Sequence, residues 1–328
     1  MQRREFIGFL GSMAIAAPRD AIAQTSSKVY RFALISPRGL EAQSNPNAKV
    51  LLGALAQRGY ALGQNLDFEG PRGAAGRTVQ LPQLMDELKA SKIDVIVVFG
   101  YPTALAAKAA GIPTVVAFGV GDPVATGLVA SLARPGGNIT GISDVATTLS
   151  TKRLGLLKEL LPKLHRVGML WNKDDLGMTL RYQASADAAK SLGSAVQPLG
   201  VREPDDFADA FAAMDRGTPD AILMVADALT LLNRKRVFDY AAAHRLPAIY
   251  EQDLFVRDGG LMSYGADFKE SLERAASLID RIFKGAKPAD LPFEEPTHYL
   301  FVVNLKTAKS IGLELPPNLL ALADEVIE

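Results

Sequence analysis

The feature that most constrains the fold of this chain is an alternation of short apolar runs with helical patterns, which starts near residue 28. Residues 94–99 read DVIVVF, an unbroken apolar run that is typical of a strand covered on both faces of a parallel sheet. Leucine and methionine recur at helical spacing over residues 77–91, and a further helix is expected from Pro102. This order predicts βαβ units, in which helices cover both faces of a parallel sheet.

The same alternation restarts after residue 141. The strands expected in this second half are residues 166–171, 195–199, 221–225, 248–250 and 260–264. A length of 328 residues exceeds what one hydrophobic core usually serves, so two α/β lobes are expected. Ligands of such open sheets lie beyond the carboxyl ends of the strands, so the cleft between the lobes is the expected ligand site.

The first residues have the features of an export signal. Arg3 and Arg4 precede a short apolar run over residues 6–17, and residues 21–23 (AIA) form a small-x-small cleavage pattern. We therefore predict a signal peptide over residues 1–23, of either the twin-arginine or the general secretory type. A buried N-terminal helix is the alternative. The apolar run is too short to span a bilayer as a helix.

Composition excludes several functions. The 36 basic and 36 acidic residues cancel, which argues against a nucleic-acid partner. The chain has no cysteine, so it has no disulfide, no thiolate metal site and no cysteine nucleophile. The three histidines, at positions 165, 244 and 298, lack metal-site spacing, and neither a nucleophile elbow nor a P-loop is present. We expect no cofactor, no metal and no catalysis, and keep an α/β enzyme as an alternative.

Polar and aromatic residues follow the expected strands. The candidate ligand-binding residues are Ser36, Pro37, Tyr101, Pro102, Thr103, Gly119, Asp122 and Asp144 in the first half, and Trp171, Asp227, Tyr250, Glu251 and Tyr264 in the second. A helix that starts at residues 101–103 would offer free N–H groups to a carboxylate, the acids would meet an ammonium group, and the rings would contact an apolar side chain. Other roles remain open: residues 101–103 could be an ordinary helix start, Asp122 a helix cap and Trp171 a core residue.

Two long segments carry a family resemblance. Residues 119–143 (GVGDPVATGLVASLARPGGNITGIS) and residues 247–328, which begin PAIYEQDLFVRDGGLMSYGADF, resemble signatures of an ABC-transporter substrate-binding protein family. That family includes binding proteins for tryptophan and other aromatic amino acids. The resemblance extends over essentially all of the chain after the signal peptide.

The resemblance implies a type I periplasmic binding protein fold with two Rossmann-like lobes hinged by three crossovers. By analogy, the N-terminal lobe comprises residues 28–142 plus 267–294, and the C-terminal lobe comprises residues 143–266 plus 295–328. It also implies capture of a small organic ligand, an amino acid or a related carboxylate, and its delivery to a membrane permease with its ATPase. We expect a periplasmic monomer that is not a lipoprotein. A sensory binding protein that presents its ligand to a membrane receptor is the alternative.

Overall fold

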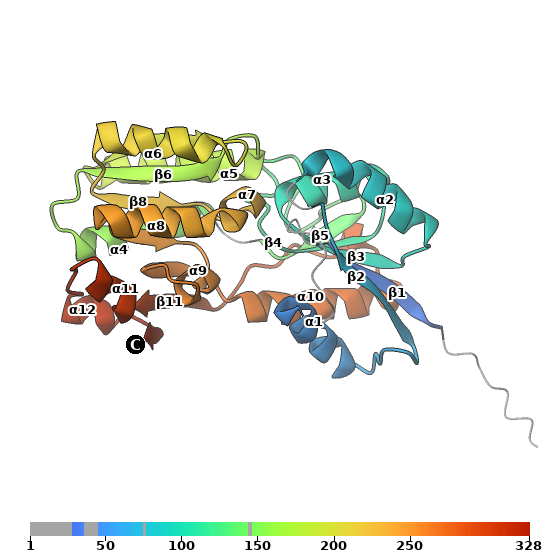
Figure 1. Ribbon diagram of the computed structural model, residues 1–328. Coiled ribbons are helices and arrows are strands. Elements are labelled where there is room, and N and C mark those ends of the chain that lie inside the picture. Colours follow the sequence, from blue (N-terminus) through green and yellow to red (C-terminus); the bar gives the residue numbers. More distant parts are fainter. Residues whose placement is uncertain (1–27, 36–44, 75–76, 144–145) are drawn as a thin grey trace, which may run out of the picture.

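Two β-sheets lie side by side along the long axis of the molecule, each with helices on its faces (Figure 1). This computed structural model describes residues 28–35, 45–74, 77–143 and 146–328. The predicted signal peptide and three candidate site residues, Ser36, Pro37 and Asp144, lie outside the described residues. We call the part built on the five-stranded sheet the first lobe, and the part built on the seven-stranded sheet the second lobe.

The first lobe is a parallel sheet with the strand order β2-β1-β3-β4-β5. Its strands are β1 (Tyr30–Ile35), β2 (Leu66–Arg72), β3 (Val95–Phe99), β4 (Thr114–Phe118) and β5 (Ile139–Gly141). Its helices are α1 (Pro46–Ala56), α2 (Leu81–Ala90), α3 (Tyr101–Ala110) and α10 (Phe268–Phe283), with short 3₁₀ turns at Thr78–Gln80 and Pro288–Asp290. Every residue of β3 and β4 is buried, as their apolar sequences require.

The second lobe has the strand order β12-β11-β10-β9-β8-β6-β7. Its strands are β6 (Arg166–Asn172), β7 (Ala195–Val201), β8 (Ala221–Met224), β9 (Ala248–Tyr250), β10 (Met262–Ala266), β11 (Tyr299–Asn304) and β12 (Glu325–Ile327). Its helices are α4 (Ala146–Leu160), α5 (Leu176–Ser191), α6 (Asp206–Gly217), α7 (Ala228–Leu232), α8 (Arg234–His244), α9 (Asp253–Arg257), α11 (Leu305–Ser310) and α12 (Pro317–Leu320).

One strand departs from the all-parallel sheets that the sequence predicts. β11 pairs antiparallel with β10, so that Met262 lies opposite Val303 and Ala266 opposite Tyr299. The cause is the path of the chain: after β10 it leaves the second lobe, forms α10 on the first sheet, and re-enters the second sheet from the end at which it left. Because the chain returns at the same end of the sheet, β11 runs antiparallel to β10, although α10 lies between them in sequence.

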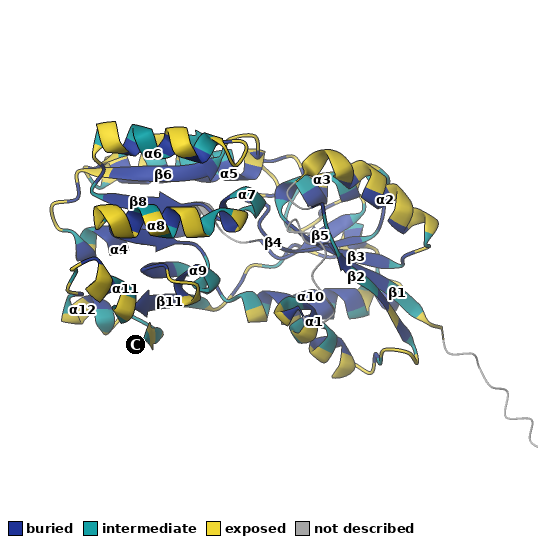
Figure 2. Cartoon of the chain, in the orientation of Figure 1, coloured by how far each residue is buried: buried dark blue, intermediate teal, exposed yellow. Residues whose placement is uncertain are grey.

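The strands are largely buried, whereas the helices carry exposed residues on their outer sides (Figure 2). The buried side chains of each sheet belong to two cores, one on each face. In β1, Phe32 and Leu34 pack under α1 and α10, whereas Ala33 and Ile35 belong to the core under α2 and α3. This alternation follows the two-residue period of a strand. α10 places six buried apolar residues, including Leu272 and Ile279, in the core of the first lobe.

Segments distant in sequence meet where the chain passes between the lobes. Ser143 N–H donates to the carbonyl of Glu294 at 2.8 Å, and Ile142 bridges Glu294 just after β5 ends. Asp267 N–H, at the start of α10, donates to the carbonyl of His298 at 3.0 Å. The chain thus passes between the sheets after β5, after β10 and before β11, and the three passages are hydrogen-bonded in pairs.

The position of Ile279 in the first core gives a stability prediction. We expect Ile279→Ala to lower the free energy of unfolding by roughly 2–5 kcal/mol, because it leaves a cavity under a fully buried side chain. Arg281→Ala, on the exposed face of the same helix, is the control and should change it by less than about 0.5 kcal/mol. Urea unfolding measures both, and equal effects would contradict the packing of α10 on the first sheet.

Candidate functional site

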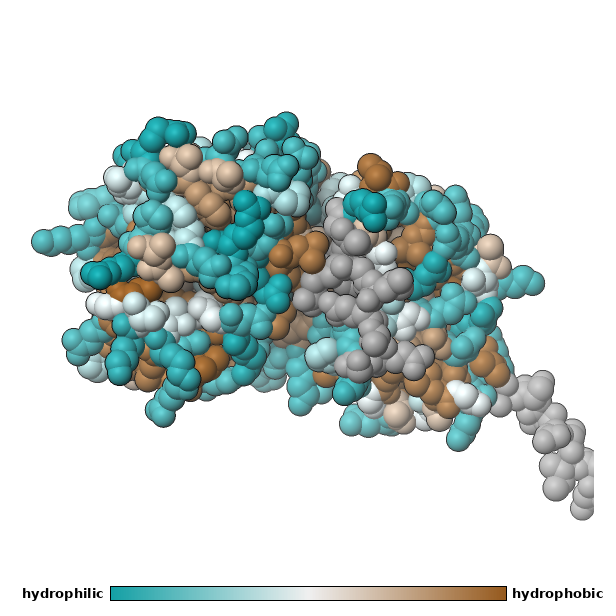
Figure 3. Space-filling model, in the orientation of Figure 1, coloured by the Kyte–Doolittle hydropathy of each residue, from teal (hydrophilic) through white to brown (hydrophobic). Residues whose placement is uncertain are grey.

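A cavity of about 370 Å³ lies between the two lobes, within the usual range for small-molecule sites. Its first-lobe wall is Asn45, Pro46, Asn47, Val50, Phe99, Gly100, Phe118, Gly119, Phe268, Lys269 and Leu272, and its second-lobe wall is Ala226, Asp227, Ala228, Leu231, Gln252, Asp253, Leu254 and Arg257. On the face drawn in Figure 3, the second lobe is largely hydrophilic, and hydrophobic atoms are exposed where the two lobes meet.

Three phenylalanines form the aromatic part of the first-lobe wall. Phe99 ends β3, Phe118 ends β4 and Phe268 begins α10. The Phe268 ring lies 5.5 Å from Phe99 with an interplanar angle of 17°, and 5.3 Å from Phe118 with an angle of 59°. These separations are those of favourable aromatic pairs, and the three rings offer an apolar aromatic surface to a ligand.

Two glycines bring the backbone of the first lobe to the cavity. Gly100 and Gly119 have φ angles of +81° and +85°, a region that favours glycine. A Cβ atom on Gly119 would lie 3.3 Å from the backbone nitrogen of Gly100, so the two loops are in close contact. Gly100 is also the N-cap of α3, and among the described residues no side chain caps that helix. The positive end of α3 is therefore available to a carboxylate near the cavity.

Asp227 supplies an acidic group on the second-lobe wall. Its carboxylate accepts hydrogen bonds from Thr230 N–H at 2.8 Å and from the Asn172 amide at 2.7 Å, which complete the N-cap of α7. Burial raises the pKa of Asp227, although these hydrogen bonds partly oppose the shift. A ligand ammonium group beside this carboxylate would offset the cost of its burial.

A network of buried charges lies behind the second-lobe wall. Glu251 accepts from Arg153 Nη1 at 2.8 Å, from Arg181 Nη1 at 2.5 Å and from Ala226 N–H at 2.9 Å. None of the three charged side chains is more than 4% exposed. Burial favours the neutral form of Glu251, but Arg181 and Arg153 prevail and hold its pKa below the ordinary value. Arg153 also donates from Nε to the carbonyl of Tyr264 at 2.7 Å.

Of the described candidates from the sequence, the structure brings Gly119 and Asp227 to the cavity. Tyr101 and Thr103 are buried at the start of α3, with Pro102 half-buried between them, and Tyr101 donates to the carbonyl of Thr126. Asp122 is exposed and accepts from the N–H groups of Val124 and Ala125. The segment that follows it is a turn and not a helix, so Asp122 caps a turn rather than the helix that the sequence predicted.

The remaining candidates lie elsewhere in the second lobe. Trp171 packs in the core and stacks on Tyr182 at 4.0 Å. Tyr250 is fully buried and lines a different cavity, of about 480 Å³. Glu251 belongs to the buried network, and the half-buried Tyr264 stacks on Tyr299. The adjacent Gln252, rather than Tyr250 or Glu251, reaches the cavity between the lobes.

Sequence reasoning missed the three phenylalanines and both arginines. Phe99 and Phe118 are the last residues of apolar strands, so the pattern assigns them to the core. Arg153 and Arg181 are separated from Glu251 by 98 and 70 residues, and no spacing rule connects such positions. A signal did exist for Phe99 and Phe118, because both stand at carboxyl ends of adjacent strands of a parallel sheet.

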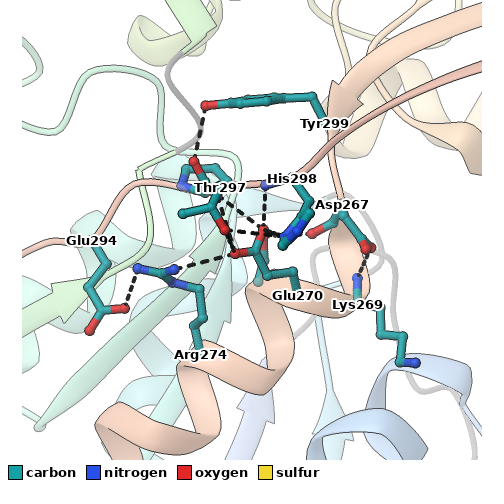
Figure 4. Close-up of polar contacts among 10 residues, drawn as sticks. Asp267, Lys269, Glu270, Arg274, Glu294, Thr297, His298 and Tyr299 are labelled. Atoms are coloured by element: carbon teal, nitrogen blue, oxygen red, sulfur yellow. Dashed lines mark hydrogen bonds and ion pairs between the residues drawn. The ribbon is translucent and has the colours of Figure 1, made fainter. Parts of the chain in front are cut away.

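The passages between the lobes are joined by a polar cluster around Glu270 on α10 (Figure 4). Its carboxylate accepts from the hydroxyl of Thr297 at 2.5 Å and from the N–H of His298 at 2.9 Å. Arg274 pairs with Glu270 and, at 2.8 Å, with Glu294. Although burial raises the pKa of Glu270, the hydrogen bonds and Arg274 lower it to about 2. The second and third passages are therefore tied together by a charge that persists at neutral pH.

No group of His, Asp and Glu in the described parts of the chain has an arrangement that would hold a metal ion. Among the described residues, no helix is long and apolar enough to cross a membrane.

The buried network predicts a large cost for the loss of one charge. We expect Glu251→Gln to lower the free energy of unfolding by roughly 3–5 kcal/mol, because it removes the negative charge between two buried arginines. The control is Glu325→Gln, which removes an exposed ion pair with Arg257 and should cost less than about 1 kcal/mol. Urea unfolding at neutral pH compares the two, and equal losses would show that burial of the network does not matter.

A second prediction concerns Asp175, the N-cap of α5, which accepts from Met178 N–H at 3.2 Å. Burial, and then the nearby Asp227, raises its pKa from 3.8 to about 7. The ionised form is therefore disfavoured in the folded state, and its cost grows as the pH rises from about 4 to 7.

Asp175→Asn keeps a capping oxygen but has no charge. We expect it to exceed the wild type in stability by on the order of a few kcal/mol at pH 8, and the difference to fade towards pH 4. Chemical denaturation across this range measures the gap, with Asp122→Asn, an exposed capping aspartate, as the control. A stability difference between Asp175→Asn and the wild type that does not change with pH would contradict the burial of the Asp175 charge.

Comparison with known proteins agrees with this architecture. The family model described as ABC transporter substrate binding protein matches residues 44–327. A tyrosine-binding protein of Clostridioides difficile strain R20291 is 27% identical over 270 residues, which are 81% of this chain and 76% of that protein.

Two solved structures share the fold over most of the chain. A conserved domain protein of Vibrio cholerae has a TM-score of 0.84 and 25% identity, covering 91% of this chain and all of that one. The ABC domain of Streptococcus pneumoniae, solved with L-Trp, has a TM-score of 0.81 and 24% identity, covering 92% of this chain and all of that one. With two α/β lobes around a cavity and a family match over nearly its whole length, this chain belongs to the substrate-binding proteins of ABC transporters.

Proposed function

We propose that this protein captures an aromatic α-amino acid, such as tyrosine or tryptophan, in the cavity between its lobes. The observation that carries the proposal is the composition of the two walls: three phenylalanine rings on the first lobe and the Asp227 carboxylate on the second. The relatives support the same class, because one is described as a tyrosine-binding protein and another was solved with L-Trp.

Each part of such a ligand has a complementary group. The aromatic side chain would pack against Phe99, Phe118 and Phe268, where ring pairs add to the burial of apolar area. The ammonium group would pair with Asp227, and the carboxylate would lie at the uncapped start of α3 beside Gly100. Among the described residues, the ligand-binding residues proposed from the sequence are thereby narrowed to Gly119, Asp227 and the start of α3, and Ser36, Pro37 and Asp144 stay predictions.

We also propose how binding serves transport. The two lobes, residues 28–142 plus 267–294 and residues 143–266 plus 295–328, would close over the ligand by rotation at the three passages. The packing of α10 on the first sheet and the pairing of β11 with the second sheet support this division. Residues 1–23 would direct export to the periplasm, where the liganded monomer would deliver its cargo to a permease and its ATPase.

Binding measurements test the ligand class. Protein freed of ligand by unfolding and refolding should bind L-Tyr, L-Trp or L-Phe by isothermal titration calorimetry and gain thermal stability from it. L-Leu and benzoate, which each lack one of the proposed contacts, should bind at least about tenfold more weakly. Equal affinity for L-Leu, or no binding of any aromatic amino acid, would contradict the proposal.

Two variants assign the contacts. Phe268→Ala should weaken binding about tenfold, whereas Phe211→Ala, a half-buried ring that stacks on Tyr240 away from the cavity, should not. Asp227→Asn should weaken binding of the amino acid roughly tenfold to a hundredfold but leave the binding of a deaminated analogue unchanged. An equal loss for both ligands would show that Asp227 does not contact the ammonium group.

A further inference from the structure

Two glycines from different lobes meet outside the ligand cavity. Gly121 lies in the loop after β4 of the first lobe, and Gly177 lies in the first turn of α5 in the second lobe. A Cβ atom on Gly177 would lie 2.8 Å from the carbonyl oxygen of Val120, and one on Gly121 would lie 3.1 Å from the Cα of Gly177. Neither glycine lines the cavity, and both are buried.

Neither side of this contact has room to move aside. Val120 is fully buried in the core of the first lobe, and the atom that a Cβ on Gly177 would strike belongs to its backbone. On the other side, Met178 is fully buried in the core of the second lobe, and Asp175 caps the helix. A side chain at position 177 could therefore be accommodated only by a shift of one lobe relative to the other.

The same helix makes a second contact across the lobes. The guanidinium carbon of Arg181, one turn further along α5, lies 6.0 Å from the centre of the Phe118 ring. Phe118 lines the ligand cavity, and Arg181 is paired with Glu251. We call Gly177 and Arg181, together with Phe118, Val120 and Gly121, the α5 contact. The α5 contact connects the two lobes beside the cavity, and Gly177 itself is not part of the cavity wall.

Helix formation does not explain glycine at position 177, because alanine is favoured over glycine within a helix. Its backbone is not in the left-handed region, so an alanine could adopt it without strain. Gly155 on α4 provides a contrast, since a Cβ atom there would meet nothing within 4 Å. Gly177 differs from Gly155 because the backbone of the other lobe lies against it.

We propose that Gly177 is a positioning residue that sets the affinity of the ligand site by permitting the lobes to close, without selecting the ligand. The inference rests on the proposed capture of a ligand between the lobes. If only a fraction of the protein molecules is in the state that can bind ligand, the apparent affinity is lowered in proportion to that fraction. A side chain at position 177 thus reduces affinity for every ligand of the cavity by one common factor.

Gly177→Ala tests the proposal, with Gly155→Ala as its matched control. Calorimetry with L-Tyr and L-Trp should show a loss of at least about tenfold for Gly177→Ala, with the ratio of the two affinities unchanged. The melting temperature of the ligand-free protein should not fall, because alanine favours the helix. Gly155→Ala should bind as the wild type does. Wild-type affinity in Gly177→Ala, or a changed ratio of affinities, would overturn the proposal.

A distance measurement separates this inference from the ligand assignment. The natural chain has no cysteine, so spin labels can be attached at Asp86→Cys on α2 and Asp209→Cys on α6, both exposed. Gly177→Ala should shift the distribution of distances between the labels towards the open arrangement. Identical distributions in Gly177→Ala and the unsubstituted protein would overturn the inference. If no aromatic amino acid binds even the wild type, the proposed function fails, and the ligand-free distributions still decide the role of Gly177.

Discussion

The apolar stripe of α10 is the constraint on which the rest of the architecture depends. Six buried apolar residues of this helix complete the core of the first lobe, although the chain reaches it only after building most of the second. To bury that stripe, the chain must pass from the second sheet to the first and then return. The second and third passages between the lobes, and with them the antiparallel β11, follow from this packing requirement. The cavity forms where the strand ends of the two sheets then face each other.

Buried charges join several elements of the second lobe next to this cavity. Glu251 joins α4, α5 and the end of β9 through Arg153 and Arg181, and it also accepts from the backbone at the end of β8. A buried network of this kind contributes little net stability compared with apolar packing, but each member is costly to remove. Its effect here is geometric, since it fixes the position of α5 and the strand end that carries Asp227. The Glu270 cluster has the corresponding role at the passages between the lobes.

The sequence predicts much of the fold and little of the site, for identifiable physical reasons. The apolar run at 94–99 is a local pattern, and it forms the buried strand β3 as expected. The path of β11 depends on where α10 packs, which no local pattern contains. In the site, Asp227 follows a strand and could be identified, whereas Glu251 immediately after another strand turns away from the cavity to two arginines. Adjacent residues at a strand end point in opposite directions, so their order along the chain does not decide which one meets the ligand.

The cavity and the α5 contact divide the binding free energy between two kinds of residue. In the proposed function, rings and charges in the cavity would discriminate among ligands, because each contact exists only if the ligand carries the matching group. The contact of Gly177 with Val120 has no such dependence, since it joins one lobe to the other. Its effect enters through the equilibrium between open and closed arrangements, which multiplies every ligand affinity equally. The two proposals therefore assign selectivity and strength of capture to different parts of the molecule, so that a substitution on α5 would change one without the other.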